Sequence, residues 1–385
     1  MGPTPKPDPS QRRLRAGIVG GGRGAFIGAV HRIAAELDGQ ALIVAGAMSS
    51  DPAIARESAA AWFLERSYAS YEEMARSEAA DTNGIDFVIV ATPNHLHYPV
   101  ARAFLAEGIH VVCDKPLTSS VAEAEELTRL VEDGRTLFAL TYNYTGYPAV
   151  REARELVRGG GLGEIRKVLV EYSQDWLMEA VENRGNKQAA WRTDPARAGL
   201  GGSVGDIGTH AANLLEYVTD KRIEAVCADL TAFVAGRRLD DDANMLIRLE
   251  GGAKGTLSCS QIACGEENRL SLRVYGSRAG LEWHQQEPNT LILKPAGSPW
   301  ERLRTGHGYL SASARAASRT PPGHPEGYLE AFANIYRGFI ADVRRVAEGQ
   351  APLRDYPGVQ DGLRGVRFVA QVVASSRAGS AWMRV

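Results

Sequence analysis

The sequence predicts two domains: an α/β domain built on a parallel sheet, then an α+β domain with a large, mostly antiparallel open sheet. Three observations support this prediction. The chain has 385 residues, more than one ordinary domain holds. Short apolar runs alternate with helical periodicity over residues 14–143, whereas longer runs that alternate apolar with polar residues occur over residues 144–385. Residues 1–13 are proline-rich and then basic, so we expect a disordered tail there.

The first domain follows the repeating strand–helix order of parallel sheets. Its predicted strands are apolar almost throughout, as expected where helices cover both faces of a sheet. We expect strands at residues 14–20, 41–48, 86–92, 110–115 and 136–142, and helices at 27–37, 53–62, 99–107 and 121–131.

The second domain begins with a helix at residues 148–158 and continues with strands that alternate in polarity, as one-sided antiparallel sheets do. The proline- and glycine-containing segment 295–322 is expected to be a loop. We expect strands at residues 165–173, 222–234, 244–249, 254–262, 269–275 and 290–293, and closing helices at 325–348 and 359–376.

Composition restricts the partners. The formal net charge of −2 gives no positive field for nucleic acid, so a small-molecule partner is expected. The longest apolar stretches, such as residues 87–91, are far shorter than the roughly 20 residues of a membrane span, so no membrane partner is expected. The N-terminus lacks the apolar core of a secretion signal, and a cytoplasmic location follows as the expectation.

The four cysteines, Cys113, Cys227, Cys259 and Cys264, are scattered, with no CxxC pair and no histidine at ligand spacing. We therefore expect no metal site and no disulfide framework, but buried reduced thiols.

Glycines follow the first predicted strand directly. Gly20, Gly22 and Ala25 stand in the places of a GxGxxG loop, just before a predicted helix. Glycine allows the tight turn and lets backbone N–H groups approach a pyrophosphate at the helix N-terminus. A glycine-rich turn without a ligand is the alternative. After the second strand, Ser49 occupies the place of the usual ribose-binding acid, with Ser50 next and Asp51 two residues further on, which leaves both NAD and NADP open. Serines can accommodate a 2′-phosphate, but no arginine follows immediately to neutralise it, which favours NAD.

Two further strands also end in candidate ligand-binding residues. Thr92-Pro93-Asn94 and His97 follow the strand at 86–92, although turn chemistry and a helix start would also explain them. Asp114-Lys115-Pro116 ends the strand at 110–115. A charged pair after an apolar strand is costly unless something compensates it, which favours a functional lysine over a surface one.

A glycine-rich segment at residues 201–208 opens a helix. Its apolar stripe is formed by Ile207, Ala211, Leu214, Leu215 and Val218, and Asp206, His210, Asn213 and Tyr217 fall on a neighbouring stripe. A carboxylate one turn before an imidazole can orient it as a general base. A helix-capping aspartate with a structural histidine is the alternative.

Together these segments resemble the Gfo/Idh/MocA family of glucose-fructose oxidoreductases and inositol dehydrogenases, over nearly the whole chain. The likeness consists of the glycine loop, TPNxxH at 92–97, GDxGxH at 205–210 and Asp114-Lys115-Pro116. The last segment corresponds to the family's E-K-P signature, with aspartate where most members have glutamate. The resemblance implies a Rossmann domain and a catalytic group of Lys115, Asp206 and His210. It also implies a cis peptide bond before Pro116 and a nicotinamide-ribose contact by Asp114. The glycine loop is two or three residues longer than the family pattern before Gly28-x-x-His31.

The motifs and the resemblance together define two residue sets. The expected NAD-binding residues are Gly20, Gly22, Arg23, Ala25, Phe26, Ile27, Ser49, Ser50, Thr92, Pro93, Asn94, His97, Asp114, Lys115 and Asn143. The expected substrate-binding residues are Lys115, Tyr142, Tyr144, Gln174, Asp175, Trp176, Lys187, Trp191, Arg192, Asp206, His210 and His324.

The expected function is hydride transfer between nicotinamide and a hydroxyl-bearing carbon of a sugar, glycoside or cyclitol, with His210 as the base. An NAD-dependent glycosidase is one alternative; it oxidises C3 transiently, eliminates the aglycone, adds water and reduces again. The basic residues Arg184, Lys187 and Arg192 would suit an anionic sugar. A non-catalytic dinucleotide-binding regulator is the other alternative. The resemblance also implies a homo-oligomer, dimer or tetramer, formed through the open sheet.

Overall fold

The computed structural model describes residues 12–385. Residues 1–11, most of the expected disordered tail, lie outside the described residues. The chain forms two compact units, each made of separate segments. The first unit contains the described residues up to Thr118, then Ala122–Thr141 and Phe332–Leu363. The second contains Ser119–Val121, Tyr142–Ala331 and Arg364–Val385.

The first unit is built on a six-stranded sheet in the order β3-β2-β1-β4-β5-β6, with every neighbouring pair parallel. Its strands are β1 (Leu14–Gly20), β2 (Ala41–Ala47), β3 (Arg66–Ser67), β4 (Phe87–Ala91), β5 (His110–Cys113) and β6 (Phe138–Leu140). The order reverses between β1 and β4, and in such sheets ligands bind beyond the carboxyl ends of the strands at that point. The parallel α/β prediction is confirmed.

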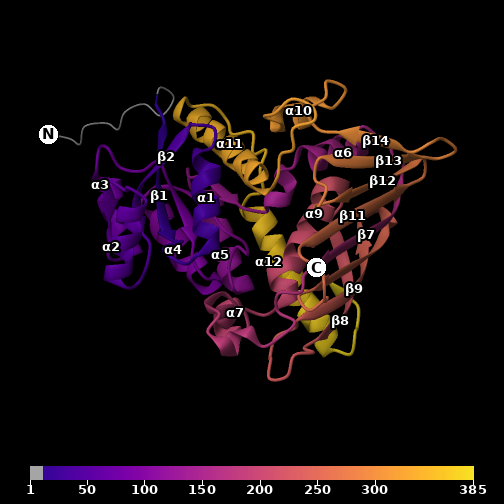
Figure 1. Ribbon diagram of the computed structural model, residues 1–385, viewed down its shortest axis with the longest axis horizontal. Helices are drawn as coiled ribbons and strands as arrows, with labels where there is room; N and C mark the ends of the chain where they lie inside the picture. Colours follow the sequence, from indigo (N-terminus) through magenta and orange to yellow (C-terminus); the bar gives the residue numbers. More distant parts are fainter. Residues whose placement is uncertain (1–11) are drawn as a thin grey trace. The chain divides into compact units, whose positions relative to one another are not determined.

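The helices of this unit are labelled in Figure 1; α1 to α5 connect the strands in sequence order, and α11 joins the unit from a later part of the chain. They are α1 (Phe26–Glu36), α2 (Pro52–Ala61), α3 (Tyr71–Ala80), α4 (His97–Ala106), α5 (Val121–Asp133) and, from Phe332 onward, α11 (Tyr328–Ala347). Right-handed crossovers place α1 and α2 on one face of the sheet and α3, α4 and α5 on the other. Helix α3 and strand β3 were not predicted, because α3 is polar over most of its surface and β3 has two residues.

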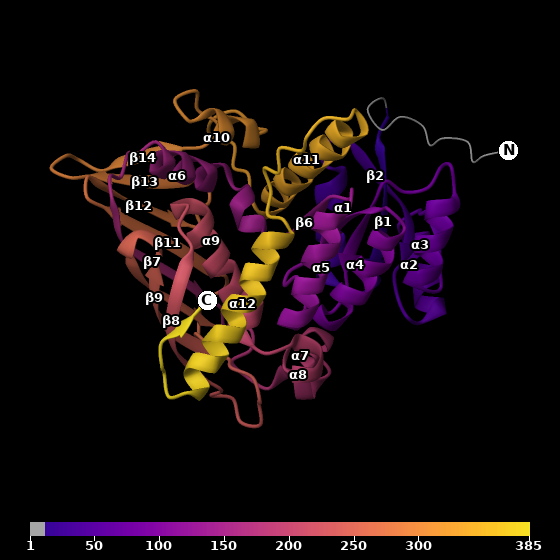
Figure 2. The ribbon, with the colours of Figure 1, turned by 180° about the vertical axis from the view of Figure 1, so that it is seen from behind.

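The second unit is built on a nine-stranded sheet in the order β14-β13-β12-β11-β7-β10-β9-β8-β15. Neighbours are antiparallel except β7 and β10, which run parallel, so the mostly antiparallel prediction is confirmed. Its strands are β7 (Ile165–Ser173), β8 (Ile223–Thr231), β9 (Asp242–Leu249), β10 (Lys254–Ser260), β11 (Arg269–Gly276), β12 (Ala279–His284), β13 (Thr290–Pro295), β14 (Glu301–Arg304) and β15 (Met383–Arg384). Strand β15, near the C terminus, pairs with β8 (Figure 2).

The prediction of a loop at residues 295–322 is partly wrong. This segment contains β14 and a short helix, α10 (Ala312–Ala317). Three of the four β14 side chains are exposed, so this edge strand lacks the apolar alternation that identifies strands in a sequence. Strand β12 was also missed.

One face of the nine-stranded sheet is covered by α6 (Pro148–Arg158) and α9 (Thr209–Thr219), as Figure 1 shows. The predicted apolar stripe of α9, from Ile207 to Val218, is buried in the core of this unit. On the other face, one row of paired residues crosses the sheet from β8 to β14, and all of its side chains are exposed or half-buried. The row consists of Cys227, Leu246, Thr256, Leu169, Arg273, Glu282, Ile292 and Arg302. Two sides of different polarity explain the alternation seen in the sequence.

Among residues 12–385, no helix has both the length and the apolarity needed to cross a bilayer. The four cysteines are free thiols. Cys113 and Cys259 are buried as predicted, whereas Cys264 is exposed in the turn after β10, so the expectation of buried thiols is wrong there.

Candidate active site

The glycine loop of the first unit forms a tight turn between β1 and α1. Gly20 and Gly21 have positive φ angles of 77° and 68°, which glycine adopts without strain. A Cβ on Gly28 would lie 2.2 Å from the Gly21 carbonyl oxygen, so only glycine fits there. Helix α1 starts after Ala25 without a side-chain cap and without an acid in its first turn. Its N-terminal N–H groups therefore fit the pyrophosphate of a dinucleotide.

Side chains that follow β1 and β2 differ in what they can offer a dinucleotide. Arg23 and Phe26 are exposed beside the glycine loop. Asp51 caps α2, accepting hydrogen bonds from the backbone N–H groups of Ala53 and Ile54. Its carboxylate is thus engaged within the chain, which leaves the two serines before it as the candidate ribose contacts after β2.

His97 connects the segments that follow β4 and β5. The ring is buried at the start of α4, with Nδ1 2.6 Å from the carbonyl oxygen of Pro116 and Nε2 2.9 Å from that of Thr92. Burial lowers the pKa of His97, and the nearby charge of Asp114 opposes this. The imidazole therefore contacts the backbone of both segments.

Asp114 and Lys115 lie at half-buried positions beyond the carboxyl end of β5. The Asp114 carboxylate accepts hydrogen bonds from the Lys115 backbone N–H at 3.0 Å and from the Thr141 hydroxyl at 2.9 Å. The peptide bond between Lys115 and Pro116 is cis, as the resemblance implies. The charged pair is thus located at the edge of the sheet where ligands of parallel α/β folds bind.

In the second unit, the segment before α9 is held by Asp240. Its carboxylate accepts hydrogen bonds from the N–H groups of Gly202 (2.7 Å) and Val204 (2.8 Å) and from the Ser203 hydroxyl (2.7 Å). A Cβ on Gly202 would lie 2.0 Å from the Asp240 carbonyl oxygen, which explains the glycine. The start of the helix is therefore fixed by a half-buried side chain.

The helix itself differs from the prediction at its start. Residues Val204–Gly208 form a π-helical turn, and α9 begins only at Thr209. Asp206 lies in the π turn and His210 in the α-helix after it, so the simple α-helical spacing predicted between them does not apply. Single π turns inside helices occur often at functional sites.

Asp206 is held by side chains from two other segments. Its Oδ2 accepts hydrogen bonds from Arg192 Nε at 3.2 Å and from Gln261 Nε2 at 2.9 Å. Arg192 belongs to α7 (Lys187–Arg192), and its guanidinium carbon lies 4.1 Å from the ring centroid of Trp191 and 5.8 Å from that of Trp176. These contacts bring together Asp206, Arg192, Trp191 and Trp176, which the sequence predicts as site residues, and Gln261, which the sequence did not predict.

His210 is buried among aromatic rings. The centroids of Tyr144, Tyr142 and Tyr172 lie 4.9, 5.5 and 6.4 Å from its own, all edge-to-face. The Tyr142 hydroxyl is 2.6 Å from the hydroxyl of Thr209. Burial raises the pKa values of Tyr144 and Tyr172, so both phenols stay neutral.

Amide side chains continue this polar group. Gln174 donates to Asn268 Oδ1 at 2.7 Å and accepts from Trp176 Nε1 at 3.1 Å. The amide nitrogen of Asn143, buried beside Tyr142, has no hydrogen-bond partner among residues 12–385, which fits a donor reserved for a ligand. Sequence reasoning missed Gln261, Asn268 and Tyr172.

Only the sheet topology identifies Gln261. Strands β7 and β10 run parallel and end with Ser173 opposite Ser260. The next residues, Gln174 and Gln261, therefore leave the sheet at the same edge. Because β7 and β10 are far apart in sequence, this pairing had no signal in the sequence.

Other predicted residues lie apart from the Asp206 group. Lys187 is exposed at the start of α7, and Asp175 contacts the Gly265 N–H at an exposed turn. His324 is exposed, with Nδ1 3.3 Å from the Pro321 carbonyl oxygen.

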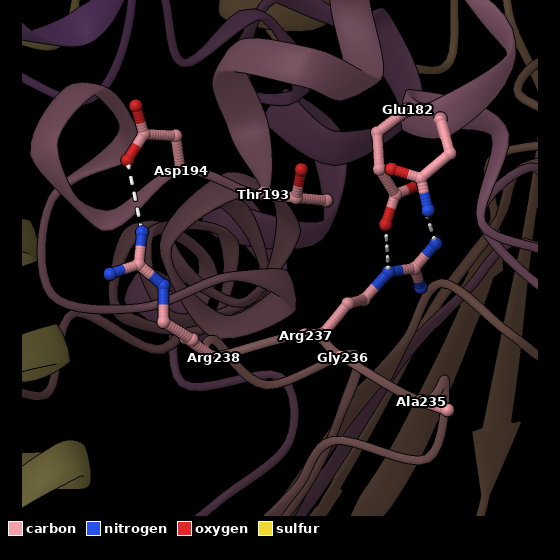
Figure 3. Close-up of a pocket in the computed structure, with 8 residues that line it drawn as sticks. Glu182, Thr193, Asp194, Ala235, Gly236, Arg237 and Arg238 are labelled. Atoms are coloured by element: carbon pink, nitrogen blue, oxygen red, sulfur yellow. Dashed lines mark hydrogen bonds and ion pairs between the residues drawn. The ribbon is translucent and has the colours of Figure 1, made fainter.

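A cavity of about 240 Å³ lies near α7 (Figure 3). Its lining residues are Glu182, Asn183, Thr193, Asp194, Ala235, Gly236, Arg237 and Arg238. Arg237 pairs with Glu182 at 2.9 Å and Arg238 with Asp194 at 3.4 Å. Since both arginines are paired, the cavity offers no uncompensated charge to a ligand.

Comparison with known proteins identifies both parts of the chain. Residues 14–142 match the family described as "Oxidoreductase family, NAD-binding Rossmann fold", and residues 150–282 match the "GFO/IDH/MocA C-terminal domain". An uncharacterised oxidoreductase of Bacillus subtilis (strain 168) is 34% identical over 378 residues, 96% of each chain. Levoglucosan dehydrogenase of Pseudarthrobacter phenanthrenivorans is 26% identical over 346 residues, 82% of each chain.

Solved structures of oxidoreductases and inositol dehydrogenase homologues resemble this chain over nearly its whole length. An oxidoreductase from Sinorhizobium meliloti has 47% identity and a TM-score of 0.88, covering 97% of this chain and 100% of that one. An inositol dehydrogenase homologue from Azotobacter vinelandii in complex with NAD⁺ has 36% identity and a TM-score of 0.94 over 99% of each chain. A complex of such a homologue with NADH and myo-inositol has 34% identity and a TM-score of 0.90, covering 99% of this chain and 100% of that one. The chain therefore belongs to the Gfo/Idh/MocA family of NAD-binding oxidoreductases.

Proposed function

We propose that the protein is an NAD-dependent dehydrogenase of an uncharged polyhydroxylated ring, a sugar or a cyclitol. The observation that carries this proposal is the group around Asp206 and His210 in the second unit. There a carboxylate and an imidazole lie among aromatic rings and side-chain amides that can bind many hydroxyl groups at once. The myo-inositol in the complex of the homologue and the levoglucosan dehydrogenase relative support a substrate of this class.

The roles follow from the chemistry of each group. His210 takes the proton of the reacting hydroxyl as general base, and Asp206 orients the imidazole and stabilises its protonated form. Lys115 binds the reacting oxygen and stabilises the charge that develops on it. The glycine loop, Asp114 and Asn143 would hold NAD, which would supply the hydride acceptor when bound.

Charge favours an uncharged substrate over an anionic one. Arg192 pairs with Asp206, and Arg184 pairs with Glu179 at 2.5 Å. Two of the three cations expected to suit an anionic sugar are therefore compensated within the chain, and the third, Lys187, is exposed on α7. An anionic substituent bound by Arg184 or Arg192 would compete with one of these ion pairs. The anionic-glycoside alternative thus has no supporting observation.

The test is a panel of myo-inositol, levoglucosan, glucose and matched aryl glycosides, each incubated with NAD. We expect NADH to form in proportion to a neutral polyol, measured by its absorbance. Release of the aryl group without net NADH would instead indicate the glycosidase. NAD binding without either product from any compound would favour the regulator.

A further inference from the structure

A continuous chain of side-chain hydrogen bonds runs from Asp206 to Tyr144. Gln261 Nε2 donates to Asp206 Oδ2 at 2.9 Å and to Gln174 Oε1 at 3.4 Å. Gln174 Nε2 donates to Asn268 Oδ1 at 2.7 Å. Asn268 Nδ2 in turn donates to the Tyr144 hydroxyl at 3.4 Å. All five side chains belong to the second unit.

Two partners fix the directions of the bonds in this chain: the carboxylate of Asp206, to which Gln261 donates, and the indole N–H of Trp176, which donates to Gln174 Oε1 at 3.1 Å. A carboxylate only accepts, so Gln261 must turn its NH₂ group toward it. Its second N–H then meets the oxygen of Gln174, so the NH₂ group of Gln174 turns toward Asn268. The oxygen of Asn268 accepts there, and its NH₂ group turns toward Tyr144.

The two tyrosines close the chain into a ring. Tyr172 donates its hydroxyl hydrogen to Asn268 Oδ1 at 2.8 Å. The remaining bond, between Tyr144 and Tyr172, must therefore use the hydrogen of Tyr144. As a result the Tyr144 oxygen can only accept from a further group, while Gln174 keeps one N–H to donate.

From this geometry we infer that Gln261 is a positioning residue: together with the Trp176 indole N–H, it links the orientation imposed by Asp206 to the substrate-binding amides, so that they present a fixed pattern of one acceptor, Tyr144, and one donor, Gln174. This inference rests on the proposed function. A hydroxyl group can donate or accept, so a polyol matches both positions. A substrate lacking a hydroxyl at either position leaves a buried group unpaired, which costs binding.

Gln261 is well placed for this role because it is 2% exposed and its backbone N–H donates to the Asp241 carbonyl oxygen at 2.9 Å. The charged groups around it are Arg192 from α7 and Arg237, Asp240 and Asp241 from the segment before β9. Arg237 pairs with Asp241 and Glu182, and Asp240 caps the π turn. Asp206 is thus the carboxylate to which the Gln261 amide donates.

The test replaces Gln261 with two residues of similar size. Gln261→Met removes both donors, and kcat/KM for the polyol should fall about ten- to a hundredfold at every pH. Gln261→Glu introduces a carboxyl group that can donate to Asp206 only while protonated. Its activity relative to the parent should therefore fall progressively as pH rises from about 5 to 9, since repulsion between carboxylates raises the pKa of the pair.

Gln350→Glu is the matched control. Gln350 also donates to a carboxylate, that of Glu348 at 3.1 Å, but at an exposed position on the first unit. Its activity relative to the parent should not depend on pH. A flat ratio for Gln261→Glu, or parent activity for Gln261→Met, would overturn the inference. NAD affinity and thermal unfolding check that each variant is folded.

A second readout separates this inference from the proposed function. If the parent oxidises no polyol, the proposed function fails, but the side-chain amide signals of selectively ¹⁵N-labelled Gln261 and Asn268 still report the chain. Asp206→Leu should move both signals, because Asp206 is linked to Asn268 through Gln261 and Gln174. Movement of the Gln261 signal alone would show that no orientation is transmitted, and the inference would be wrong.

Discussion

The imidazole of His97 lies between two backbone carbonyls, 2.6 Å from Pro116 and 2.9 Å from Thr92. These carbonyls belong to the segments that follow β4 and β5, which carry Asn94, Asp114 and Lys115. His97 thus connects residues proposed to bind NAD without itself being exposed.

Replacing His97 with phenylalanine keeps a ring but removes the N–H group that donates to one of these carbonyls, since an imidazole whose pKa is lowered by burial carries a single N–H. We expect NAD affinity to fall about tenfold, the equivalent of one hydrogen bond, measured by titration calorimetry. His95→Phe in the same segment is the control, because Nδ1 of His95 has no hydrogen-bond partner among the described residues. Equal NAD affinities of the two variants would contradict the connecting role.

Acid sensitivity should arise from His31. Its Nδ1 is 2.6 Å from the Tyr336 hydroxyl, and burial lowers its pKa to about 4. Because the folded pKa is below the value of about 6.5 in the unfolded chain, the unfolded state binds more protons between these values. Stability is therefore lost as pH falls, by about 2 kcal/mol between pH 7 and 5 for this group.

The check is urea unfolding of the parent and of His31→Gln at both pH values. The variant should be less stable at pH 7 but should lose less stability on acidification. A parent and a variant with the same pH dependence would show that folding does not lower the pKa of His31.

Replacing Asp240 should lower the free energy of unfolding more than removing an ordinary helix cap does. Asp240→Ala leaves two buried N–H groups and a hydroxyl unpaired, so we expect a loss of roughly 2–3 kcal/mol of unfolding free energy. Activity should fall as well, because the π turn carries Asp206. Asp51→Ala, which uncaps the exposed start of α2, should cost only about 1 kcal/mol and leave polyol oxidation less affected. Chemical denaturation measures both; equal losses would contradict the special role of Asp240.

The sequence identified the parallel sheet and the order of the motifs because apolar strands and glycine turns are local signals. It could not show the π turn at Val204–Gly208, since one inserted residue leaves the apolar stripe of α9 nearly unchanged. Nor could it show Gln261 and Asn268, which approach Asp206 and Tyr144 only through strand pairing between distant segments. Edge strand β14 was missed because its side chains are mostly charged and exposed.

The expected homo-oligomer can be tested on the second face of the nine-stranded sheet. Leu246 on β9 is 52% exposed in the row of side chains across that face. If copies associate there, Leu246→Arg buries a charge at the contact and should lower the mass in light scattering toward 41.5 kDa. A parent that already has the monomer mass would contradict the expectation. Leu353→Arg, which changes an exposed leucine of the first unit, is the control.

The most direct test of the proposed chemistry is to compare NAD binding and polyol oxidation in His210→Ala and Lys115→Ala. We expect turnover to fall by about 10²- to 10⁴-fold, the usual contribution of general acid–base catalysis. His210→Ala should bind NAD nearly as the parent does. Turnover equal to that of the parent in either variant would contradict the account.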